Sequence, residues 1–407
     1  MPRPLSHIRV LDLTRILAGP WATQSLADLG AEVIKIERPK SGDDTRSWGP
    51  PWLKGSDGRD THEAAYYLSV NRGKKSVTID LSKPAGQRLV RDLAAKSDVL
   101  VENYKVGDLA RYGLAYEDVR RVNPGIVYCS VTGFGQDGPY AARAGYDFVF
   151  QGMAGLMSIT GERDDLPGGG PQKVGIAVTD VLTGMYASLA VTAAIAYRQL
   201  TGTGQYIDMA LLDTLVAFNA NQISNYWCSG EIPRRYGNAH ANIVPYEVFP
   251  SADGHIILAV GNDGQFASFC RVAGRSELAD DPRFRSNPDR VRNRAVLVPI
   301  VQAIVRTRKS RDWIDALEAA GVPCGPINNM QEVFENPQVR HRGLRVDIPH
   351  PAGVPCPTVA SPMLFSETPV TYKAPPPQLG EHTREVLSGV LGLSSQELDR
   401  LAAEGAI

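Results

Sequence analysis

The sequence predicts an α/β protein with a Rossmann-like large domain, built on a parallel sheet, and a smaller α+β domain. Over the first 200 residues, short apolar runs of strand type alternate with segments of helical pattern, which is typical of an open parallel sheet. From about residue 230 to 326 the pattern becomes hairpin-like, with an Asp-Gly turn between the two β runs of YEVFPSADGHIILAV. These two patterns favour two domains of different architecture.

Length and charge set the broad class. The 407 residues are enough for two or more domains, and 43 Lys plus Arg against 44 Asp plus Glu leave no global field that would attract nucleic acid or a membrane. The five cysteines lie far apart with no CxxC pair, which argues against a structural zinc site or a disulfide scaffold. The N-terminus has no apolar signal core. We therefore expect a cytoplasmic protein without a metal, a nucleic-acid partner or a membrane partner.

Residues 8–37 predict a strand, a helix and a second strand. The apolar run IRVLDL is followed by Gly19 and Pro20, where a helix can begin, and the helix ends by Gly30 before the strand AEVIKIE. The unit lacks a GxGxxG motif, which argues against a dinucleotide oxidoreductase. The Gly-, Pro- and Trp-rich stretch that follows, up to residue 67, predicts a long ordered loop.

The alternation continues through residues 70–135, with strands in SVTIDL, DVLVEN and IVYCSV. Ligands of such sheets gather at the carboxyl ends of the strands. Those ends carry basic, polar and small residues, namely Arg15, Arg38, Asn103, Lys105 and Gly135. Basic residues there suit a phosphate-bearing ligand, although about half of them could be solvated surface charges.

The segment from residue 174 to 215 holds one carboxylate, Asp180, at the start of an apolar helix. Residues 181–200 are dominated by apolar and small side chains, which predicts a helix buried on all faces, and Thr183, Ser188 and Thr192 favour a soluble core helix over a membrane span. One interpretation makes Asp180 the N-cap of this helix. The alternative is that a carboxylate kept ionised in a dry setting is the nucleophile for an activated acyl group.

Beyond this helix, GQYIDMAL predicts a strand and LDTLVAFNANQISNYW a second long helix. RAVLVPIVQAIV and SRDWIDALEAAG predict helices of the smaller domain, and HTREVLSGVLG and SQELDRLAAEG predict two terminal helices.

Taken together, several segments resemble the class III coenzyme A transferases of the CaiB/BaiF type. The matching segments follow the family's order over nearly the whole chain and include LDLTRILAGPWATQSLADLGAEVIKIERP, VENYKVGDLARYGL, SVTGFGQDGPY, VGIAVTDVLTG and LGEHTREVL. The resemblance implies that residues 1–205 and 332–407 form a Rossmann-like CoA-binding domain. It also implies that residues 206–331 form a linker helix and a small α+β domain, and that two subunits interlock as a homodimer.

The resemblance also implies which residues act. Asp180 matches the catalytic aspartate of the family. The positions that hold CoA in the family match Arg15, Ile16, Leu17, Ala18, Arg38, Lys75, Asn103, Tyr104 and Arg111. Coenzyme A and its thioesters would then be substrates, and no permanently bound cofactor is expected.

The segments GDDTRSWGPP and RRYGNAHANIVPYEVFPSADGHI are similar to the dicarboxylate-using branch of the family, typified by succinate–hydroxymethylglutarate (or glutarate) CoA-transferase. This similarity implies that CoA passes from succinyl-CoA to a dicarboxylic acid through an aspartyl mixed anhydride and an aspartyl-CoA thioester. Arg46, Arg72 and His240 lie near the family's pocket positions for the acceptor acid. The alternative for Arg46 is an ion pair with Asp43 or Asp44 in its own loop.

Two other functions are weighed against this one. Related racemases of 2-methylacyl-CoA carry a His where this chain has Tyr146, so one proton-transfer group needed for racemisation is missing, and Tyr146 is expected to line the substrate pocket instead. A non-catalytic acyl-CoA-binding protein would keep the basic residues but could dispense with Asp180. The complete motif around Asp180 therefore favours a transferase.

Overall fold

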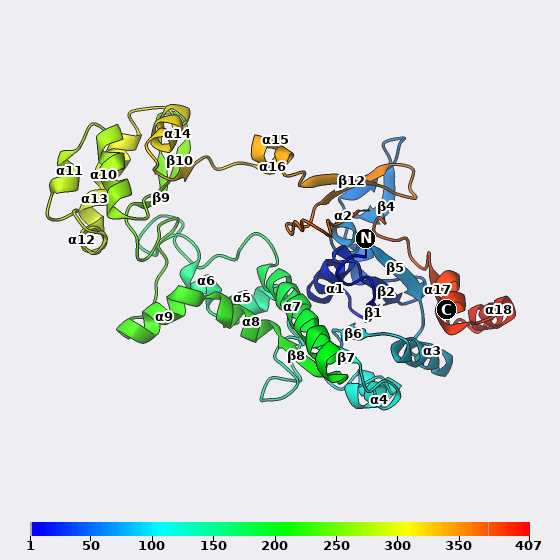
Figure 1. The fold of residues 1–407 in the computed structure, drawn as a ribbon. Coiled ribbons are helices and arrows are strands. Elements are labelled where there is room, and N and C mark those ends of the chain that lie inside the picture. The colour runs from blue at the N-terminus through cyan, green and yellow to red at the C-terminus, as the bar shows by residue number, and fades with distance from the viewer. Residues whose placement is uncertain (1, 373) are drawn as a thin grey trace. The chain divides into compact units, whose positions relative to one another are not determined.

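The computed structural model describes residues 2–372 and 374–407 and separates the chain into two compact units (Figure 1). The first unit comprises Met1–Leu156, Val174–Ser224 and Gln338–Ile407, and the second comprises Met157–Lys173 and Asn225–Pro337. The boundary expected after residue 205 differs, because residues 206–224 belong to the first unit, where they supply a strand of its sheet. Residues 157–173 belong to the second unit, although they were expected in the large domain.

The first unit is built on a six-stranded parallel sheet, ordered β5-β2-β1-β6-β7-β8. The strands are β1 (Arg9–Asp12), β2 (Glu32–Glu37), β5 (Lys74–Thr78), β6 (Val99–Glu102), β7 (Val127–Thr132) and β8 (Tyr206–Ala210). Counted along the chain, the order is third, second, first, fourth, fifth and sixth, which is the Rossmann order. The prediction of a Rossmann-like parallel sheet is therefore confirmed, and the strand order reverses between β1 and β6.

Helices join the strands of this sheet and cover it. The connecting helices of this unit are α1 (Ala18–Asp28), α2 (Ala65–Val70), α3 (Pro84–Ala95), α4 (Tyr116–Val122), α5 (Asp147–Met153) and α7 (Val178–Thr201), whereas most of α6 (Leu156–Ile159) belongs to the second unit. Helices α17 (Thr383–Leu391) and α18 (Ser395–Ala403) end the chain, and they share one buried core with α3, α4 and the sheet, to which Leu93, Leu100, Val386 and Leu401 belong. The two ends of the chain thus fold against the same sheet.

Helix α7 packs closely on α1. A Cβ atom added to Gly184 would lie only 2.6 Å from the carbonyl oxygen of Ala18, so only glycine allows this approach. The helix ends at Gly202, whose left-handed conformation closes the last turn. The contact fixes the first turns of α7 against the beginning of α1.

The prediction that this helix is buried on all faces is wrong for the single chain. Met185 and Tyr186 are about half exposed, and Leu189 and Leu200 are 65% and 88% exposed. These exposed apolar side chains account for the uniform hydrophobicity of the helix. Among the described residues, α7 is the one helix long and apolar enough to cross a membrane by length and composition, and 44% of its apolar window is buried.

Two other predictions for this unit are wrong in detail. The stretch before residue 67 is not only loop, because β3 (Trp52–Lys54) and β4 (Asp60–Ala64) pair as a hairpin. The long helix expected after β8 is broken into α8 (Leu211–Phe218) and α9 (Ala220–Ser229). At the break, Ala220 has a φ of 41°, and the Asn219 side chain donates to the carbonyl of Ala154, a tertiary contact that the local pattern could not reveal.

The second unit is a small α+β domain, as the hairpin pattern predicted. Strands β9 (Tyr246–Pro250) and β10 (His255–Ala259) are antiparallel, and β11 (Cys324–Gly325) adds a third strand. The surrounding helices include α10 (Asp263–Val272), α13 (Arg294–Val305) and α14 (Ser310–Ala319). Their apolar sides enclose one core around Phe249, Phe269 and Trp313.

Candidate active site

The reversal of strand order marks the place where an open sheet of this kind binds its ligand. The loops that leave the carboxyl ends of β1 and β6 meet there. The backbone N–H of Arg15 donates to Asn103 Oδ1 over 3.0 Å, and Asn103 Nδ2 donates to the carbonyl of Arg15 over 2.7 Å. The structure thus brings together two segments that the sequence assigned to CoA.

The turn from β1 into α1 is strained and ends in free donors. Ile16 has a φ of 73°, a left-handed conformation that costs a β-branched residue about 1–3 kcal/mol. Helix α1 has no side-chain cap, and in the part of the chain that is described the N–H groups of Leu17 and Ala18 donate to no acceptor. Two amides at a helix N-terminus form a site for a negatively charged oxygen.

Basic side chains surround this turn. Arg15 is exposed and pairs with Asp44 over 2.9 Å, and Arg38 is exposed just after β2. Burial raises the pKa of Tyr104, and Arg15 and Arg38 act against that rise, which shows that both guanidinium groups lie near the phenol. Arg111 lies on the same loop after β6 and pairs with Asp108 over 2.8 Å. These positions suit a ligand that carries phosphates.

Lys75 does not join this group. It is the second residue of β5 and pairs with Glu32, the first residue of β2, over 3.1 Å and with Glu385 over 2.9 Å. In a parallel sheet these positions lie toward the amino ends of the strands, whereas Arg15 and Asn103 lie at the carboxyl ends. The position of Lys75 therefore does not support the predicted contact with CoA.

Asp180 is the third residue of α7 and not its N-cap, which is Ala177. The N-cap interpretation is therefore wrong. Its half-buried carboxylate accepts no hydrogen bond from any residue that the structure describes. Burial, and then the neighbouring charge of Asp147, raise its pKa to about 7. A carboxylate left without partners at this depth is available for chemistry.

Asp147 performs the capping instead. It is almost fully buried, its Oδ1 accepts the N–H of Thr179 over 2.7 Å, and its Oδ2 accepts from Gln151 Nε2 over 2.7 Å. Tyr66 lies close by, since burial and then Asp180 raise the pKa of its phenol to about 12. Neither residue was predicted to take part, although Asp147 directly follows Tyr146, which was. Asp147 thus caps α7 through the N–H of Thr179, and Asp180 accepts no hydrogen bond from the described residues.

Two arginines predicted to bind the acceptor acid already have carboxylate partners. Arg46 donates from Nε and Nη2 to the two oxygens of Glu37, over 2.8 and 2.7 Å. Its partner is thus neither Asp43 nor Asp44, the alternative considered from sequence. Arg72 is buried and pairs with both oxygens of Asp28, over 2.9 and 2.6 Å. Both pairs are buried ion pairs of the fold, and a role toward the acceptor stays a prediction.

The two remaining predicted residues lie apart in the chain's two units. Tyr146 immediately precedes α5 in the first unit and is 69% exposed. His240 lies in the second unit, where burial, and then the charge of Arg294, lower its pKa. The Arg294 guanidinium donates to the carbonyls of His240 and Ala241, over 2.7 and 2.9 Å, and so fixes this loop.

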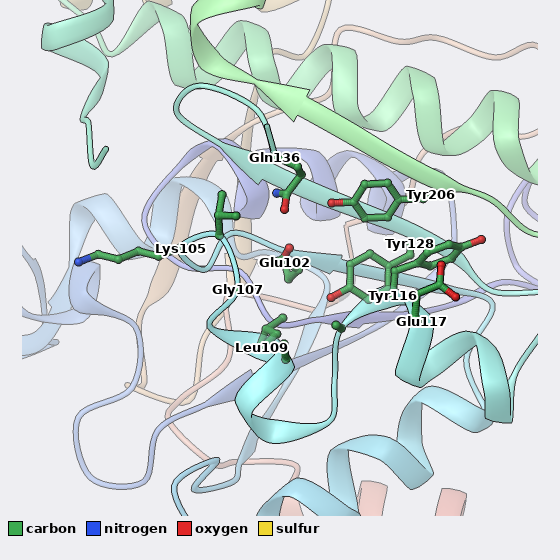
Figure 2. A pocket seen from close by; sticks show the side chains of 12 residues that line it. Glu102, Lys105, Gly107, Leu109, Tyr116, Glu117, Tyr128, Gln136 and Tyr206 are labelled. Carbon is green, nitrogen blue, oxygen red and sulfur yellow. The ribbon is translucent and has the colours of Figure 1, made fainter. Parts of the chain in front are cut away.

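A pocket of about 340 Å³ lies along the sheet beside the loop after β6 (Figure 2). Figure 2 shows Tyr116, Tyr128 and Tyr206 grouped on one side of it and Lys105 on the other. Burial raises the pKa of Glu102 to about 7, and this carboxyl accepts the N–H of Tyr104 over 2.7 Å and a hydrogen bond from the Ser130 hydroxyl. Glu102 thereby holds the loop that carries Asn103.

No group of three or more His, Cys, Asp or Glu side chains in residues 2–372 and 374–407 could hold a metal ion. The groups available for chemistry are the carboxylate of Asp180, the N-terminus of α1 and the exposed guanidinium groups of Arg15 and Arg38.

Comparisons with known proteins agree with this chemistry. The model of CoA-transferase family III matches residues 5–383. A succinate–glutarate CoA-transferase of Agrobacterium fabrum is 52% identical over 385 residues, 95% of each chain, and a human succinyl-CoA:glutarate CoA-transferase is 43% identical over 100% of this chain and 90% of its own. A CaiB/BaiF family protein from Brucella suis, solved by crystallography, superimposes with a TM-score of 0.83 at 46% identity, over 96% of this chain and 100% of its own.

Proposed function

Because the chain belongs to CoA-transferase family III, we propose that it moves CoA from succinyl-CoA to a dicarboxylic acid such as glutarate. The names of the similar proteins support the choice of acids. The observation that carries the proposal is the carboxylate of Asp180, which is half-buried and accepts no hydrogen bond from the described residues. A fold that leaves such a group unpaired loses stability, so the group is expected to serve the reaction.

In the first step an Asp180 oxygen attacks the thioester carbonyl of succinyl-CoA. The C–S bond breaks, which leaves a mixed aspartyl–succinyl anhydride and the CoA thiolate. The thiolate then attacks the aspartyl carbonyl, so that succinate leaves and CoA is held on Asp180 as a thioester. The acceptor carboxylate repeats these two steps in reverse and leaves as its CoA thioester. One thioester replaces another, so the reaction needs no nucleotide.

The structure supplies electrostatic help for these steps. Each attack on a carbonyl creates an oxyanion, and the free N–H groups of Leu17 and Ala18 are donors of the kind that stabilise one. A well-placed donor contributes about 3–4 kcal/mol to such a transition state. The exposed Arg15 and Arg38 are suited to the phosphates of CoA, and Asn103 fixes the backbone of Arg15.

The second carboxylate of the acceptor needs a cation or several donors. Since Glu37 and Asp28 occupy much of Arg46 and Arg72, we propose His240, whose carbonyl accepts from Arg294, as a residue that contacts the acceptor acid. The exposed phenol of Tyr146, beside Asp147, is also free to contact an acyl group.

We further propose that the protein is a homodimer in the cytoplasm, whose subunits interlock as in its family. The apolar side of α7 supports this proposal, because Met185, Tyr186, Leu189 and Leu200 are too exposed for an isolated chain. A second copy is the partner that would cover it most simply.

Racemisation of a 2-methylacyl-CoA is not favoured. It would require a second proton-transfer group beside the aspartate, and the corresponding position is Tyr146, 69% exposed. The family relatives reported above are named as transferases.

Trapping the activated aspartate tests the proposal. The protein is incubated with succinyl-CoA and hydroxylamine, and the peptide that carries Asp180 is mapped by mass spectrometry. Hydroxylamine converts an activated aspartyl carbonyl into a hydroxamate, so we expect the label at Asp180 alone and none in Asp180→Asn. Binding of the CoA ester without any labelled residue would refute the mechanism.

A further inference from the structure

Lys35 and Asp43 form an ion pair that the reaction, as described so far, does not use. Lys35 lies in the middle of β2, Asp43 lies in the loop after it, and the side chains of both are fully buried, with Nζ and Oδ2 2.8 Å apart. A buried ion pair is a poor source of stability, because removing two charges from water costs nearly as much as their attraction returns. Its presence inside a parallel strand therefore calls for another explanation.

The pair is bonded to the turn between β1 and α1. Lys35 Nζ donates to the carbonyl of Thr14 over 2.7 Å, and Asp43 Oδ1 accepts the backbone N–H of Ile16 over 3.2 Å. Burial alone would raise the pKa of Asp43, but Lys35 and the hydrogen bonds of Thr45 hold it at about 2, so the carboxylate stays charged. Lys35 and Asp43 thus bond to the backbone on the two sides of Arg15, at Thr14 and at Ile16.

Ile16, to which Asp43 bonds, is also the residue with a strained backbone. Ile16 has a φ of 73°, which a β-branched residue adopts only when its surroundings enforce it. Asn103 bonds to the N–H and the carbonyl of Arg15, and that carbonyl shares its peptide group with the Ile16 N–H, which only Asp43 accepts among the described residues. Without Asp43 the N–H of Ile16 would have no acceptor, and the turn could relax to an ordinary backbone conformation. The N–H groups of Leu17 and Ala18 directly follow this turn.

We propose that Lys35 and Asp43 are positioning residues, which hold residues 14–16 in a strained turn so that the amides of Leu17 and Ala18 face the reacting thioester. The inference rests on the proposed function, because it assigns these amides to the acyl-CoA. It differs from a structural role in a measurable way. A pair that only stabilised the fold would change the unfolding midpoint and leave the kinetics of the folded enzyme unchanged.

The test uses Lys35→Met, Asp43→Asn and the double variant. Misplacement of a backbone donor by about 1 Å can cost about 100-fold in rate, so we expect kcat/KM for succinyl-CoA to fall between 10- and 100-fold in each. The double variant should be no worse than the single ones, because both act through one turn. The affinity for free CoA, measured by calorimetry, should fall about 10-fold.

Asp98→Asn is the matched control. Asp98 also accepts a backbone N–H, that of Arg9 over 2.7 Å, and pairs with Arg198 over 2.9 Å, but it lies just before β6, at the amino ends of the strands and not at the carboxyl ends where the turn lies. This variant should lose stability and keep the kcat/KM of the wild type. Circular dichroism and the hydrodynamic size show which variants are folded.

Ile16→Gly keeps the test decisive if the charge variants fail to fold. It removes no buried charge and keeps the backbone bonds to Lys35 and Asp43, so we expect a folded protein; because glycine lets the turn adopt more backbone conformations, the amides of Leu17 and Ala18 are held less firmly and kcat/KM should fall about 10-fold. Folded variants whose kcat/KM and CoA affinity both stay within twofold of the wild type would overturn the inference. If the wild type itself transfers no CoA, the proposed function fails, and the CoA affinities alone decide whether the pair positions the turn.

Discussion

Replacing the central carboxylate should make the protein more stable while it destroys transfer. Burial and the charge of Asp147 raise the pKa of Asp180 from 3.8 to about 7, so the folded protein holds a proton that the unfolded chain releases. The native state is then penalised progressively as the pH rises from about 4 to 7. At about 1.4 kcal/mol per pH unit, the full penalty above pH 7 reaches about 4 kcal/mol. Asp180→Asn has the same shape without the charge and escapes this penalty.

The measurement is urea unfolding of both proteins at pH 5, 6, 7 and 8, at one protein concentration. We expect the difference in the free energy of unfolding to grow with pH in favour of Asp180→Asn and to level off above pH 7. Asp213→Asn is the control, since Asp213 is likewise the third residue of its helix, α8, but is exposed. Loss of its favourable interaction with the helix dipole should destabilise the protein by about 0.3–1 kcal/mol.

Two results would refute this reasoning. If Asp180→Asn were no more stable than the wild type at pH 8, the carboxylate would have partners that compensate its burial. If the gain in stability were equal at pH 5 and pH 8, the cause would be shape and not charge. Retention of transfer by Asp180→Asn would separately remove Asp180 from the reaction.

Three further predictions follow from the same contacts. The kcat/KM for succinyl-CoA should fall below pH 7, because Asp180 takes up a proton there. In a pH–rate profile, Asp147→Asn should move this fall to lower pH, since the charge of Asp147 no longer raises the pKa of Asp180. An unchanged profile would exclude an electrostatic interaction between the two carboxylates. Gly184→Ala should lose about 1–3 kcal/mol of unfolding free energy because its methyl group meets the start of α1, whereas Gly389→Ala, in an open part of α17, should gain about 0.5–1 kcal/mol; thermal melts that rank them otherwise would contradict the packing. Arg46→Ala should lose about 3–5 kcal/mol in urea unfolding because its carboxylate partner stays buried, and a stable variant with a raised KM for the acceptor acid would instead support the sequence prediction.

The strands and most helices were predictable because their signals are local. An apolar run between turn residues, as in IRVLDL or DVLVEN, identifies a strand whatever lies beside it. The break after α8 was not predictable in this way. It depends on Asn219, whose side chain reaches the carbonyl of Ala154, 65 residues away in the chain. The apolar side of α7 was misread for a related reason, since composition shows that a face avoids water but not what covers it.

The residues of the site likewise divide into those that the sequence could predict and those that depend on tertiary contacts. Asp180 came from its motif, and the donors after β1 and β6 followed from the rule that ligands bind at strand ends. Lys75 shows the limit of that reasoning. The family resemblance assigned it to CoA, but only the pairing of β5 with β2 shows that it lies toward the amino ends of the strands. Asp147 and Lys35 were missed, since an acidic cap supplied by another helix and a cation inside a strand are defined by contacts that no spacing records.

The groups that define the site have one physical property in common. Each of them lowers the stability of the protein when no substrate is bound. Among residues 2–372 and 374–407, Asp180 is half-buried without a hydrogen-bond partner, Ile16 is held at a φ of 73°, and the amides of Leu17 and Ala18 donate to no acceptor. A substrate thioester that used these groups would relieve them as it became an oxyanion and an acyl-aspartate, so its binding would grow stronger as the reaction advanced. The carboxylate of Asp180 and the amides of Leu17 and Ala18 thereby remain available to stabilise the transition state. The buried pair of Lys35 and Asp43 fits the same logic, because it keeps the strained turn from relaxing before the substrate arrives.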